Sequence, residues 1–547
     1  MTTSTSVKLF VIIFILMIGS TTFSQAQVQQ WMKHELTFES DKQYENPLYE
    51  LDSFYTIFTA PSGRIHKING FWDGGKSWKV RFMPDEVGEW QYQTSCSDET
   101  NLGLSAQEGS FLCEKNTKEH AIYQQGNIIH NEGDYHLSYA NGTPFFWLAC
   151  TAWNGTLKST EKEWEDYLTH RKAHNYSVIQ FVTTQWRASE VNSQLQKAYS
   201  GQGKIKINPS FFQHLDQKID KINEHGLVAA PVLLWALPKG EGKELSPGYA
   251  LPQEEAVKLA RYMVARYGAH HVIWILGGDG WYTHLYEQRW KNIGRGVFGD
   301  EHPGVVAQHP MGRSWIGEAY ANEDWLDIVG YQSSHGVNAG TIDWINKGPM
   351  KKNWDKLPAR PLINMEPCYE EIYFRTTDTH VRNASYWSIF ATPVAGVTYG
   401  ANGIWPWIRK GEKILNHGSL SEKSPSTWRE SIDFPGSQQM GYLAKFIQQF
   451  DWWELKPDHD LLQKQPGDKQ FDHYISLLRT DDYRTILAYI PFRTEVQITN
   501  AQNINYRGQW YNPVKDSYRD AEIESRSNSI FATPPDEGDW VLVLRAE

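Results

Sequence analysis

Eight apolar runs, separated by segments with helical periodicity, occupy the centre of this 547-residue chain. The runs are PFFWLACTAW (144–153), SVIQFVTT (177–184), LVAAPVLLW (227–235), HVIWILGGD (271–279), GVVAQHP (304–310), LDIVGYQSS (326–334), PLINMEP (361–367) and AGVTYGANGIW (395–405). Nearly continuous apolar strands between helices are typical of a parallel sheet that is buried on both faces. Eight such units predict a closed (β/α)8 barrel.

The segments between the runs carry helix signals. PSFFQHLDQKIDKINEHG, for example, has Ser210 near its start and Gly226 just past its last periodic residue. An open, doubly wound sheet is the alternative architecture. It is disfavoured because no G-x-G-x-x-G phosphate-binding signature follows the first strand.

Short strands flank the predicted barrel on both sides. Residues 27–120 contain alternating segments such as HELTFES, SFYTIFTA and GEWQYQTSCS, and residues 441–547 contain YRTILAYIPF and DWVLVLRAE. Such strands, punctuated by Gly and Pro turns, predict antiparallel β-sandwiches. We therefore expect an α/β protein in which a (β/α)8 barrel at 121–440 lies between an N-terminal sandwich at 27–120 and a C-terminal sandwich at 441–547.

The first 26 residues have the pattern of a secretory signal peptide. Lys8 precedes an apolar run from Leu9 to Ile18, and small and polar residues lead to Ala26. The run is shorter than the roughly 20 residues that span a bilayer, so a retained membrane anchor is the weaker interpretation. We expect an exported protein, either periplasmic or secreted, without a membrane anchor.

Charge and cysteine usage exclude some classes of function. A net charge of −11 does not suit a general nucleic-acid binder, which needs basic surfaces. The four cysteines fit no zinc spacing. Cys96 and Cys113 lie in one segment and could pair after export, whereas Cys150 and Cys368 are expected to be buried free thiols.

Two of the eight predicted strands end in carboxylates. Asp279 ends the fourth run, and Glu366 lies at the end of the seventh. Active sites of such barrels form at the C-terminal ends of the strands, so both side chains should face one cavity. Glycoside hydrolysis uses two carboxyl groups, one to protonate the leaving oxygen and one to attack the sugar or activate water. The alternative interpretations are a helix cap for Asp279 and a salt bridge at the rim for Glu366.

Aromatic and polar residues end the remaining strands and could bind a sugar. The chain has 24 Trp, 28 Tyr and 23 Phe, and indole faces stack on the apolar faces of sugar rings, although core packing also explains such residues. The candidate substrate-binding residues are Trp153, Gln185, Trp186, Trp235, His309, Gln332, His335, Tyr369 and Trp405. We expect no metal and no cofactor, because no second histidine stands at metal-ligand spacing from His309.

Several motifs together resemble one family. FFWLACTAWN, VIWILGGD, AQHPMGRSW and LINMEPCYE resemble the apiosidase-like glycoside hydrolases. The N-terminal segment is similar to the sandwich that often accompanies these barrels, and the C-terminal segment resembles a small sandwich of the collagen-binding type. The resemblance implies bacterial (β/α)8 enzymes that act on plant cell-wall glycans, with the family's strand-four Asp at Asp279 and its strand-seven Glu at Glu366. Gly280 and Trp281 depart from the family pattern, so apiose specificity does not transfer.

The leading hypothesis is hydrolysis of a glycosidic bond in a plant or algal cell-wall polysaccharide or a derived oligosaccharide. Retention is expected, with Asp279 as general acid/base and Glu366 as nucleophile. The alternatives are a non-catalytic glycan-binding protein on an enzyme-like scaffold and a polysaccharide lyase. The partner is a carbohydrate in each case, and the oligomeric state is left open.

Overall fold

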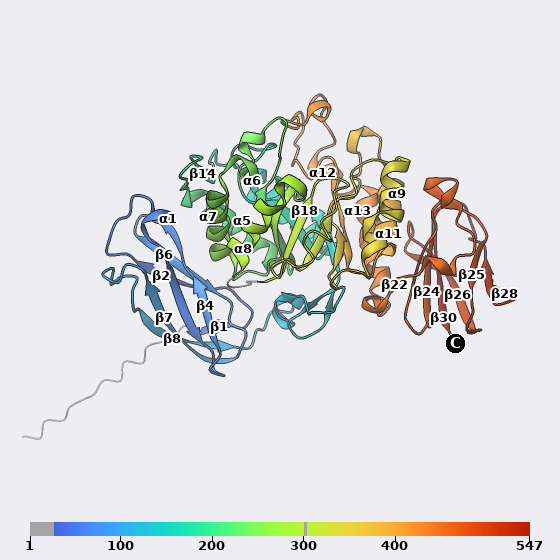
Figure 1. Cartoon of the computed structure of the whole chain (residues 1–547), viewed down its shortest axis with the longest axis horizontal. Coiled ribbons are helices and arrows are strands. Elements are labelled where there is room, and N and C mark those ends of the chain that lie inside the picture. The colour runs from blue at the N-terminus through green and yellow to red at the C-terminus, as the bar shows by residue number, and fades with distance from the viewer. Residues whose placement is uncertain (1–26, 300–303) are drawn as a thin grey trace, which may run out of the picture.

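Three parts follow one another along the chain. The computed structural model describes residues 27–299 and 304–547, and Figure 1 shows a pair of sheets, a barrel wrapped in helices and a second pair of sheets in a row. This is the fold class that the sequence predicts. The predicted signal peptide lies outside the described residues.

Two sheets form the N-terminal part, with the strand orders β1-β8-β7-β3-β4 and β2-β6-β5. The strands are β1 (Gln27–Gln29), β2 (His34–Glu39), β3 (Phe54–Thr59), β4 (Ile65–Asn69), β5 (Phe71–Gly74), β6 (Ser77–Phe82), β7 (Gly88–Cys96) and β8 (Glu108–Glu114); helix α1 is Pro47–Glu50. Phe58, Val80 and Trp90 are buried between the sheets. The alternation of apolar and polar residues thus produces the predicted sandwich.

The suggested pairing of Cys96 with Cys113 is wrong. Cys113 lies opposite Gly88, the first residue of β7, whereas Cys96 is the last residue of that nine-residue strand. At about 3.4 Å per residue the two thiols are roughly 27 Å apart, far beyond the reach of a disulfide. All four cysteines are free and buried, which confirms the expectation for Cys150 and Cys368.

Eight parallel strands close the central barrel, in the order β12-β13-β16-β17-β18-β19-β20-β21. Their bounds are β12 (Trp147–Thr151), β13 (Val178–Val182), β16 (Val228–Trp235), β17 (Trp274–Gly280), β18 (Val306–Pro310), β19 (Ile328–Tyr331), β20 (Leu362–Asn364) and β21 (Gly396–Tyr399). Seven of the strands fall within their apolar runs, and β17 extends one residue past its run, to Gly280. Every residue of seven of these strands is buried, and Asp279 is the exception in the eighth, β17.

Helices cover the barrel except after its fifth strand. They are α3 (Gly155–Lys158), α4 (Glu161–Ala173), α5 (Pro209–Glu224), α6 (Pro247–Ala250), α7 (Gln253–Tyr267), α8 (Glu287–Phe298), α9 (Ala339–Lys347), α10 (Pro349–Asn353), α11 (Asp378–Phe390), α12 (Trp428–Ser431) and α13 (Pro435–Ile447). The segment 311–327, between β18 and β19, contains no helix. Buried Ile316, Tyr320 and Trp325 cover the barrel there instead.

A small antiparallel sheet lies under the barrel, drawn in cyan in Figure 1. It consists of β9 (Ile128–Ile129), β10 (Leu137–Tyr139) and β11 (Pro144–Phe145), after the short helix α2 (Ala121–Gln124). The first apolar run therefore supplies β11 as well as β12. Because this sheet lies at the N-terminal ends of the strands, their C-terminal ends face the long loops at the top of Figure 1.

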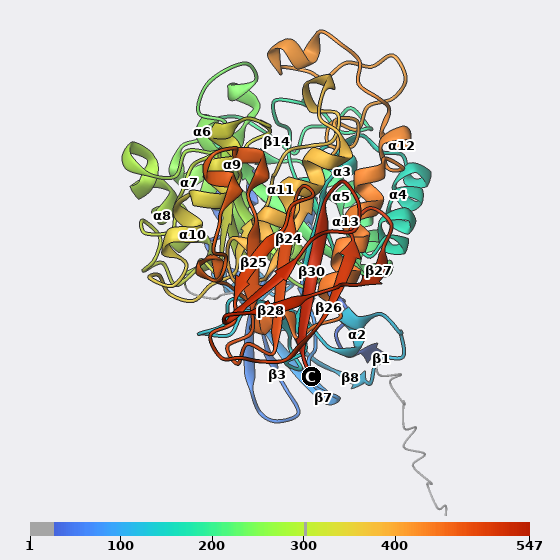
Figure 2. The same cartoon turned by 90° about the vertical axis from the view of Figure 1, so that its right-hand side faces the viewer.

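The C-terminal part also has two sheets, with the orders β22-β23-β24-β30-β26-β27 and β25-β29-β28. Figure 2 shows it in front of the barrel. The strands are β22 (Lys456–Pro457), β23 (Ser476–Arg479), β24 (Thr485–Ile490), β25 (Val496–Thr499), β26 (Tyr506–Asn512), β27 (Ser517–Asp520), β28 (Glu524–Arg526), β29 (Ser529–Ala532) and β30 (Trp540–Ala546). Helix α13, which packs on α11, spans position 440, where the sequence places the end of the barrel.

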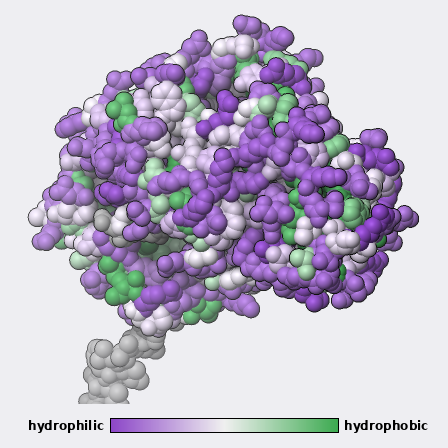
Figure 3. All heavy atoms as spheres, turned by 45° about the vertical axis from the view of Figure 1, so that its right-hand side comes forward, coloured by the Kyte–Doolittle hydropathy of each residue, from purple (hydrophilic) through white to green (hydrophobic). Residues whose placement is uncertain are grey.

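The surface carries no large apolar region in the view of Figure 3, where apolar residues occur in small groups between polar ones. Within residues 27–299 and 304–547, no helix is long and apolar enough to cross a bilayer.

Candidate active site

Asp279 and Glu366 lie where two barrel strands end. Asp279 is the penultimate residue of β17, the fourth strand, and Glu366 follows β20, the seventh, by two residues. The C-terminal ends of the strands share one face of the barrel. The two carboxyl groups are close enough for the charge of Glu366 to act on the pKa of Asp279.

Glycines beside Asp279 let its strand fit the barrel. A Cβ atom at Gly278 would lie 2.8 Å from the Trp235 ring and 2.9 Å from Val232, which is too close. Asp279 itself has a φ of 52°, in the left-handed region that side chains rarely adopt. Strained backbone of this kind often occurs at functional sites. The Gly-Gly-Asp-Gly sequence therefore serves both packing and the direction of the carboxyl group.

Glu366 is buried between two histidines. Its Oε2 atom lies 3.1 Å from Nε2 of His309, which belongs to β18. Its Oε1 atom lies 3.1 Å from Nε2 of His335, in the loop after β19. Oε2 and His309 Nε2 have no well-aligned hydrogen-bond partner among the described atoms, so their contact is electrostatic.

His309 also connects the two carboxylates. The backbone N–H of Asp279 donates a hydrogen bond of 3.2 Å to Nδ1 of His309. The opposite nitrogen of the same ring faces Glu366. One imidazole thus spans the distance from the backbone of the fourth strand to the carboxylate after the seventh.

The two carboxyl groups have opposite electrostatic environments. Burial, followed by the negative charge of Glu366, raises the pKa of Asp279 to about 7. Burial also acts to raise the pKa of Glu366, but His309 and His335 outweigh it and hold that pKa well below its usual range. Near neutral pH, Asp279 can therefore carry a proton while Glu366 is ionised.

Comparison with known proteins identifies the family of this chain. A model of the apiosidase-like catalytic domain matches residues 131–454, more than half of the chain. The chain belongs to the apiosidase-like family. A domain of unknown function matches residues 27–97, and a collagen-binding-like domain matches residues 456–545. These matches confirm the resemblance seen in the sequence and make the protein a glycoside hydrolase.

Solved structures share the fold of this apiosidase-like hydrolase. A glycoside hydrolase with 23% sequence identity superposes with a TM-score of 0.67, covering 79% of this chain and 99% of its own. A family 5 glycoside hydrolase from Bacteroides vulgatus has 23% identity and a TM-score of 0.66, covering 78% of this chain and 94% of its own. A putative glycoside hydrolase from that organism has 16% identity and a TM-score of 0.68, covering 96% of this chain and 100% of its own. No curated protein matches the sequence.

Four of the predicted tryptophans form a connected cluster in the apiosidase-like barrel. The Trp153 ring lies 5.5 Å from Trp235 and 5.7 Å from His309. Trp186 lies 4.4 Å from Trp235 and 6.2 Å from Trp405. All four indoles are buried, so any sugar would meet edges and corners of this cluster rather than open ring faces.

The indole N–H groups of the cluster differ in their partners. Trp153 donates to the Tyr369 hydroxyl at 2.9 Å, and Trp186 donates to Oδ1 of Asn154 at 2.6 Å. The N–H groups of Trp235 and Trp405 are buried without a hydrogen-bond partner among the described atoms. Buried donors normally have partners. These two donors are therefore available to a substrate.

Tyr369 belongs to the same site as the carboxylates. Its ring lies 4.4 Å from that of His335. Burial, and next the charge of Glu366, hold the pKa of Tyr369 well above its usual range. Its hydroxyl therefore stays protonated and can donate near Glu366.

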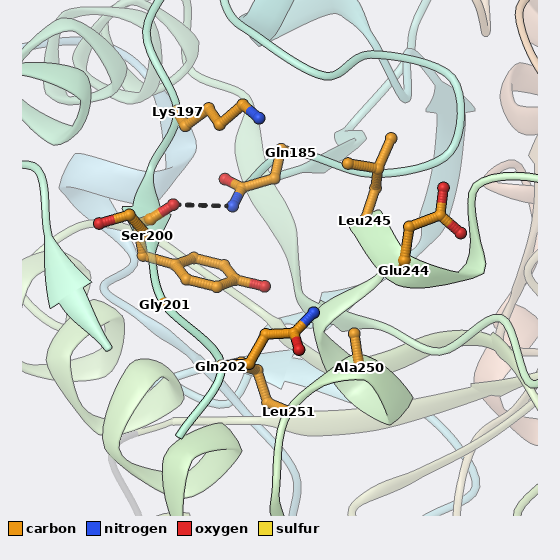
Figure 4. A pocket seen from close by; sticks show the side chains of 10 residues that line it. Gln185, Lys197, Ser200, Gly201, Gln202, Glu244, Leu245, Ala250 and Leu251 are labelled. Atoms are coloured by element: carbon orange, nitrogen blue, oxygen red, sulfur yellow. Dashed lines mark hydrogen bonds between the residues drawn. The ribbon is translucent and has the colours of Figure 1, made fainter. Parts of the chain in front are cut away.

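Two predicted residues are turned elsewhere. Gln185 donates to the Tyr199 carbonyl at 3.0 Å and accepts from Ala198 N–H at 3.0 Å. Figure 4 shows its side chain at the edge of a separate cavity of about 330 Å³, which neither carboxylate lines. Gln332 is buried beside Gly312, where its Oε1 would lie 2.9 Å from an added Cβ. No hydrogen bond or ion pair to Asp279 or Glu366 is seen for Gln185 or Gln332 within the described residues.

Two further residues near the carboxylates and the tryptophans were not among the predicted site residues. Nε and Nη2 of Arg187 both donate to the Asn416 carbonyl, at 3.2 and 2.6 Å, and its charge lowers the pKa of Asp279. The His417 ring lies 4.8 Å from Trp405. Arg187 follows Trp186 directly and could have been chosen on its position, but nothing in the sequence marks His417 because it lies far along the loop after β21.

A metal site is not formed by the described residues of this hydrolase: no group of three or more His, Cys, Asp or Glu side chains is placed to hold an ion.

Proposed function

We propose that this glycoside hydrolase cleaves glycosidic bonds with retention, using Asp279 as general acid/base and Glu366 as nucleophile. In the first step an oxygen of Glu366 bonds to the anomeric carbon while Asp279 gives its proton to the departing oxygen. In the second step water attacks that carbon, Asp279 takes the water proton, and the bond to Glu366 breaks.

The opposite protonation of the two carboxyl groups carries the proposal. A general acid must hold a proton near the working pH, and a nucleophile must be ionised. Burial and Glu366 raise the pKa of Asp279 to about 7, while the two histidines hold that of Glu366 low. Placement after strands four and seven supports retention by analogy with other barrel glycosidases.

We infer that the substrate is a plant or algal cell-wall polysaccharide or an oligosaccharide from it. Family membership supports this class, as does the tryptophan cluster, which contacts His309 and contains two buried N–H donors without a partner among the described atoms. The signal-peptide pattern of residues 1–26 supports export to where such polymers are degraded.

Screening pectic and algal glycans for released reducing sugar tests the activity. NMR spectroscopy of the first product gives its anomeric configuration. An unchanged configuration supports the retaining mechanism, and an inverted one overturns it. A product that absorbs as an unsaturated uronate would identify a lyase, and binding of glycans without turnover would identify a binding protein.

Substitutions at the two carboxylates test their roles. Glu366→Gln should lower kcat by more than about 10⁴-fold, and Asp279→Asn by about 10²- to 10⁴-fold. Because Asp279 acts as an acid, wild-type activity should fall as the pH rises through about 7, and this limb should vanish in Asp279→Asn. Asp166→Asn, on the outer surface of α4, is the matched control. Unchanged turnover in Glu366→Gln would exclude it as the nucleophile.

A further inference from the structure

The hydrogen-bond partners of His335 fix where its protons are. Nδ1 lies 3.1 Å from the Pro367 carbonyl oxygen, which can only accept, so Nδ1 carries a proton. Nε2 lies 3.1 Å from Oε1 of Glu366. An ionised carboxylate can also only accept, so this contact is attractive only if Nε2 is protonated too. Facing an ionised Glu366, His335 is therefore an imidazolium cation.

His309 has the opposite arrangement. The Asp279 N–H donates to its Nδ1, which must therefore be free of a proton. The single ring proton lies on Nε2, the atom that faces Oε2 of Glu366. A second proton would set two N–H groups against each other in a fully enclosed position. His309 is therefore neutral, with the Nε2–H tautomer fixed by the backbone of the fourth strand.

We propose that His335 and His309 are positioning residues with different charges: a cationic His335 keeps Glu366 ionised, and a neutral His309, held by the backbone N–H of Asp279, keeps its Nε2 edge beside Oε2 of Glu366. This inference rests on the proposed function, because it assigns these rings to the nucleophile. It also moves both residues from the substrate-binding role that the sequence suggests to the support of a catalytic group.

The groups around Asp279 show what this assignment means for the acid. Asp279 is faced by Glu366, His309, His335 and Arg187. A cationic His335 and an ionised Glu366 together are close to neutral, and Arg187, which also feels the charge of Glu241, is the other cation near the acid. When Glu366 bonds to the sugar it loses its negative charge, so the pKa of Asp279 falls and the group becomes a base for the second step. The cation of His335 then favours the return of negative charge to Glu366 as that bond breaks.

NMR spectroscopy of the full chain with ¹⁵N-labelled histidine tests the protonation states without any substrate. Long-range ¹H–¹⁵N correlations distinguish imidazolium from the two neutral tautomers, and spectra of His335→Gln and His309→Gln assign the signals. We expect His335 to carry protons on both ring nitrogens in the wild type, where Glu366 is ionised, and to be neutral in Glu366→Gln, with His309 as the Nε2–H tautomer in the wild type. A neutral His335 in the folded wild type at pH 7 would overturn the proposal.

Kinetics separate positioning from a general structural role. His335→Gln should lower kcat roughly 100-fold with little change in KM. Loss of the cation raises the pKa of Glu366, so the acidic limb of the pH profile should move to higher pH. His225→Gln, at the far end of α5, is the control. An equal fall in kcat with an unmoved acidic limb would show that His335 has only a structural role.

The two proposals fail in different ways. If the wild type cleaves no glycan, the proposed function fails, and the protonation states remain measurable. If the wild type cleaves glycan with retention but His335 is neutral, only the present inference fails. Should His335→Gln not fold, the spectrum of His309→Gln identifies the signal of His309, and the other ring signal that changes in Glu366→Gln is then that of His335.

Discussion

At the scale of single residues, two buried tryptophans differ in whether their indole N–H has a partner, so one can be tested for substrate binding and the other for stability. The N–H of Trp405 is buried and has no hydrogen-bond partner among the described atoms, whereas the N–H of Trp164 donates to the Lys218 carbonyl at 3.0 Å. An unpaired buried donor costs about 1–3 kcal/mol. A protein tolerates this cost where a ligand completes the hydrogen bond.

Trp405→Phe should therefore lower kcat/KM about tenfold, the loss expected for one hydrogen bond to substrate, and leave the melting temperature nearly unchanged. Trp164→Phe removes an additional hydrogen bond to a carbonyl of α5 and part of a fully buried ring, so it should lower the melting temperature without affecting KM. Steady-state kinetics and thermal unfolding of both variants check this. A Trp405→Phe protein with wild-type kcat/KM would show that this N–H does not meet the substrate.

The sequence predicts much of this site, but not its contacts. Strand ends are local features, so Asp279, Glu366 and the tryptophans follow from counting apolar runs. The loop after β19 is different: nothing in SSHG shows that His335 turns back to Glu366. The tautomer of His309 likewise depends on an N–H that a neighbouring strand supplies. Gln185 was predicted from its position after the second strand, but its side-chain amide donates a hydrogen bond to the β14–β15 hairpin (Tyr199–Ser200 and Lys206–Ile207).

At the scale of elements, the start of helix α13 is capped from elsewhere in the chain. Its own N-cap residue makes no side-chain hydrogen bond to the helix, and the Glu370 carboxyl group accepts one of the first N–H groups instead. Oε1 of Glu370 accepts from the Gly436 N–H at 3.2 Å, and Oε2 accepts from the Tyr399 hydroxyl at 2.8 Å. Burial nevertheless raises the pKa of Glu370 to about 7. Because the folded-state pKa lies above the unfolded one, the associated stability is present below about pH 4.5 and is lost as the pH rises through about 7.

Glu370→Gln keeps the acceptor for α13 and removes the titration. The variant should match the wild type at pH 5 and exceed its stability at pH 8, by about 3 kcal/mol at most. Glu430→Gln is a control of opposite sign, because hydrogen bonds from Thr427 lower the pKa of Glu430 at the start of α12. Denaturation at both pH values measures the difference. A Glu370→Gln protein that is less stable than the wild type at pH 8 would contradict this account.

At the scale of the whole molecule, buried ion pairs attach both sandwiches to the barrel. On the C-terminal side, Arg382 of α11 binds Asp539 through two hydrogen bonds of 2.7 Å. On the N-terminal side, Asp216 of α5 accepts from Arg81 of β6 at 2.6 Å and from Arg266 of α7 at 2.7 Å. These pairs fix orientation, since removing one partner leaves a buried charge without compensation.

Asp216→Asn should therefore loosen the N-terminal sandwich. Two arginines lose their shared anion, which costs at most about 3–5 kcal/mol because Arg81 keeps Glu35 and Arg266 keeps Asp73. Asp166→Asn removes only surface ion pairs with Lys162 and Arg429 and should have little effect. Hydrogen exchange should rise in β6 and α5 of the Asp216→Asn variant only.

The arginines lower the pKa of Asp216 to about 2, so in the wild type the attachment should hold at pH 5 and weaken only as the pH falls below about 3.8. If the N-terminal sandwich mainly shields the barrel, Asp216→Asn should retain its turnover at 25 °C and lose it at a lower temperature than the wild type. Lower turnover already at 25 °C would instead assign the sandwich a part in substrate binding.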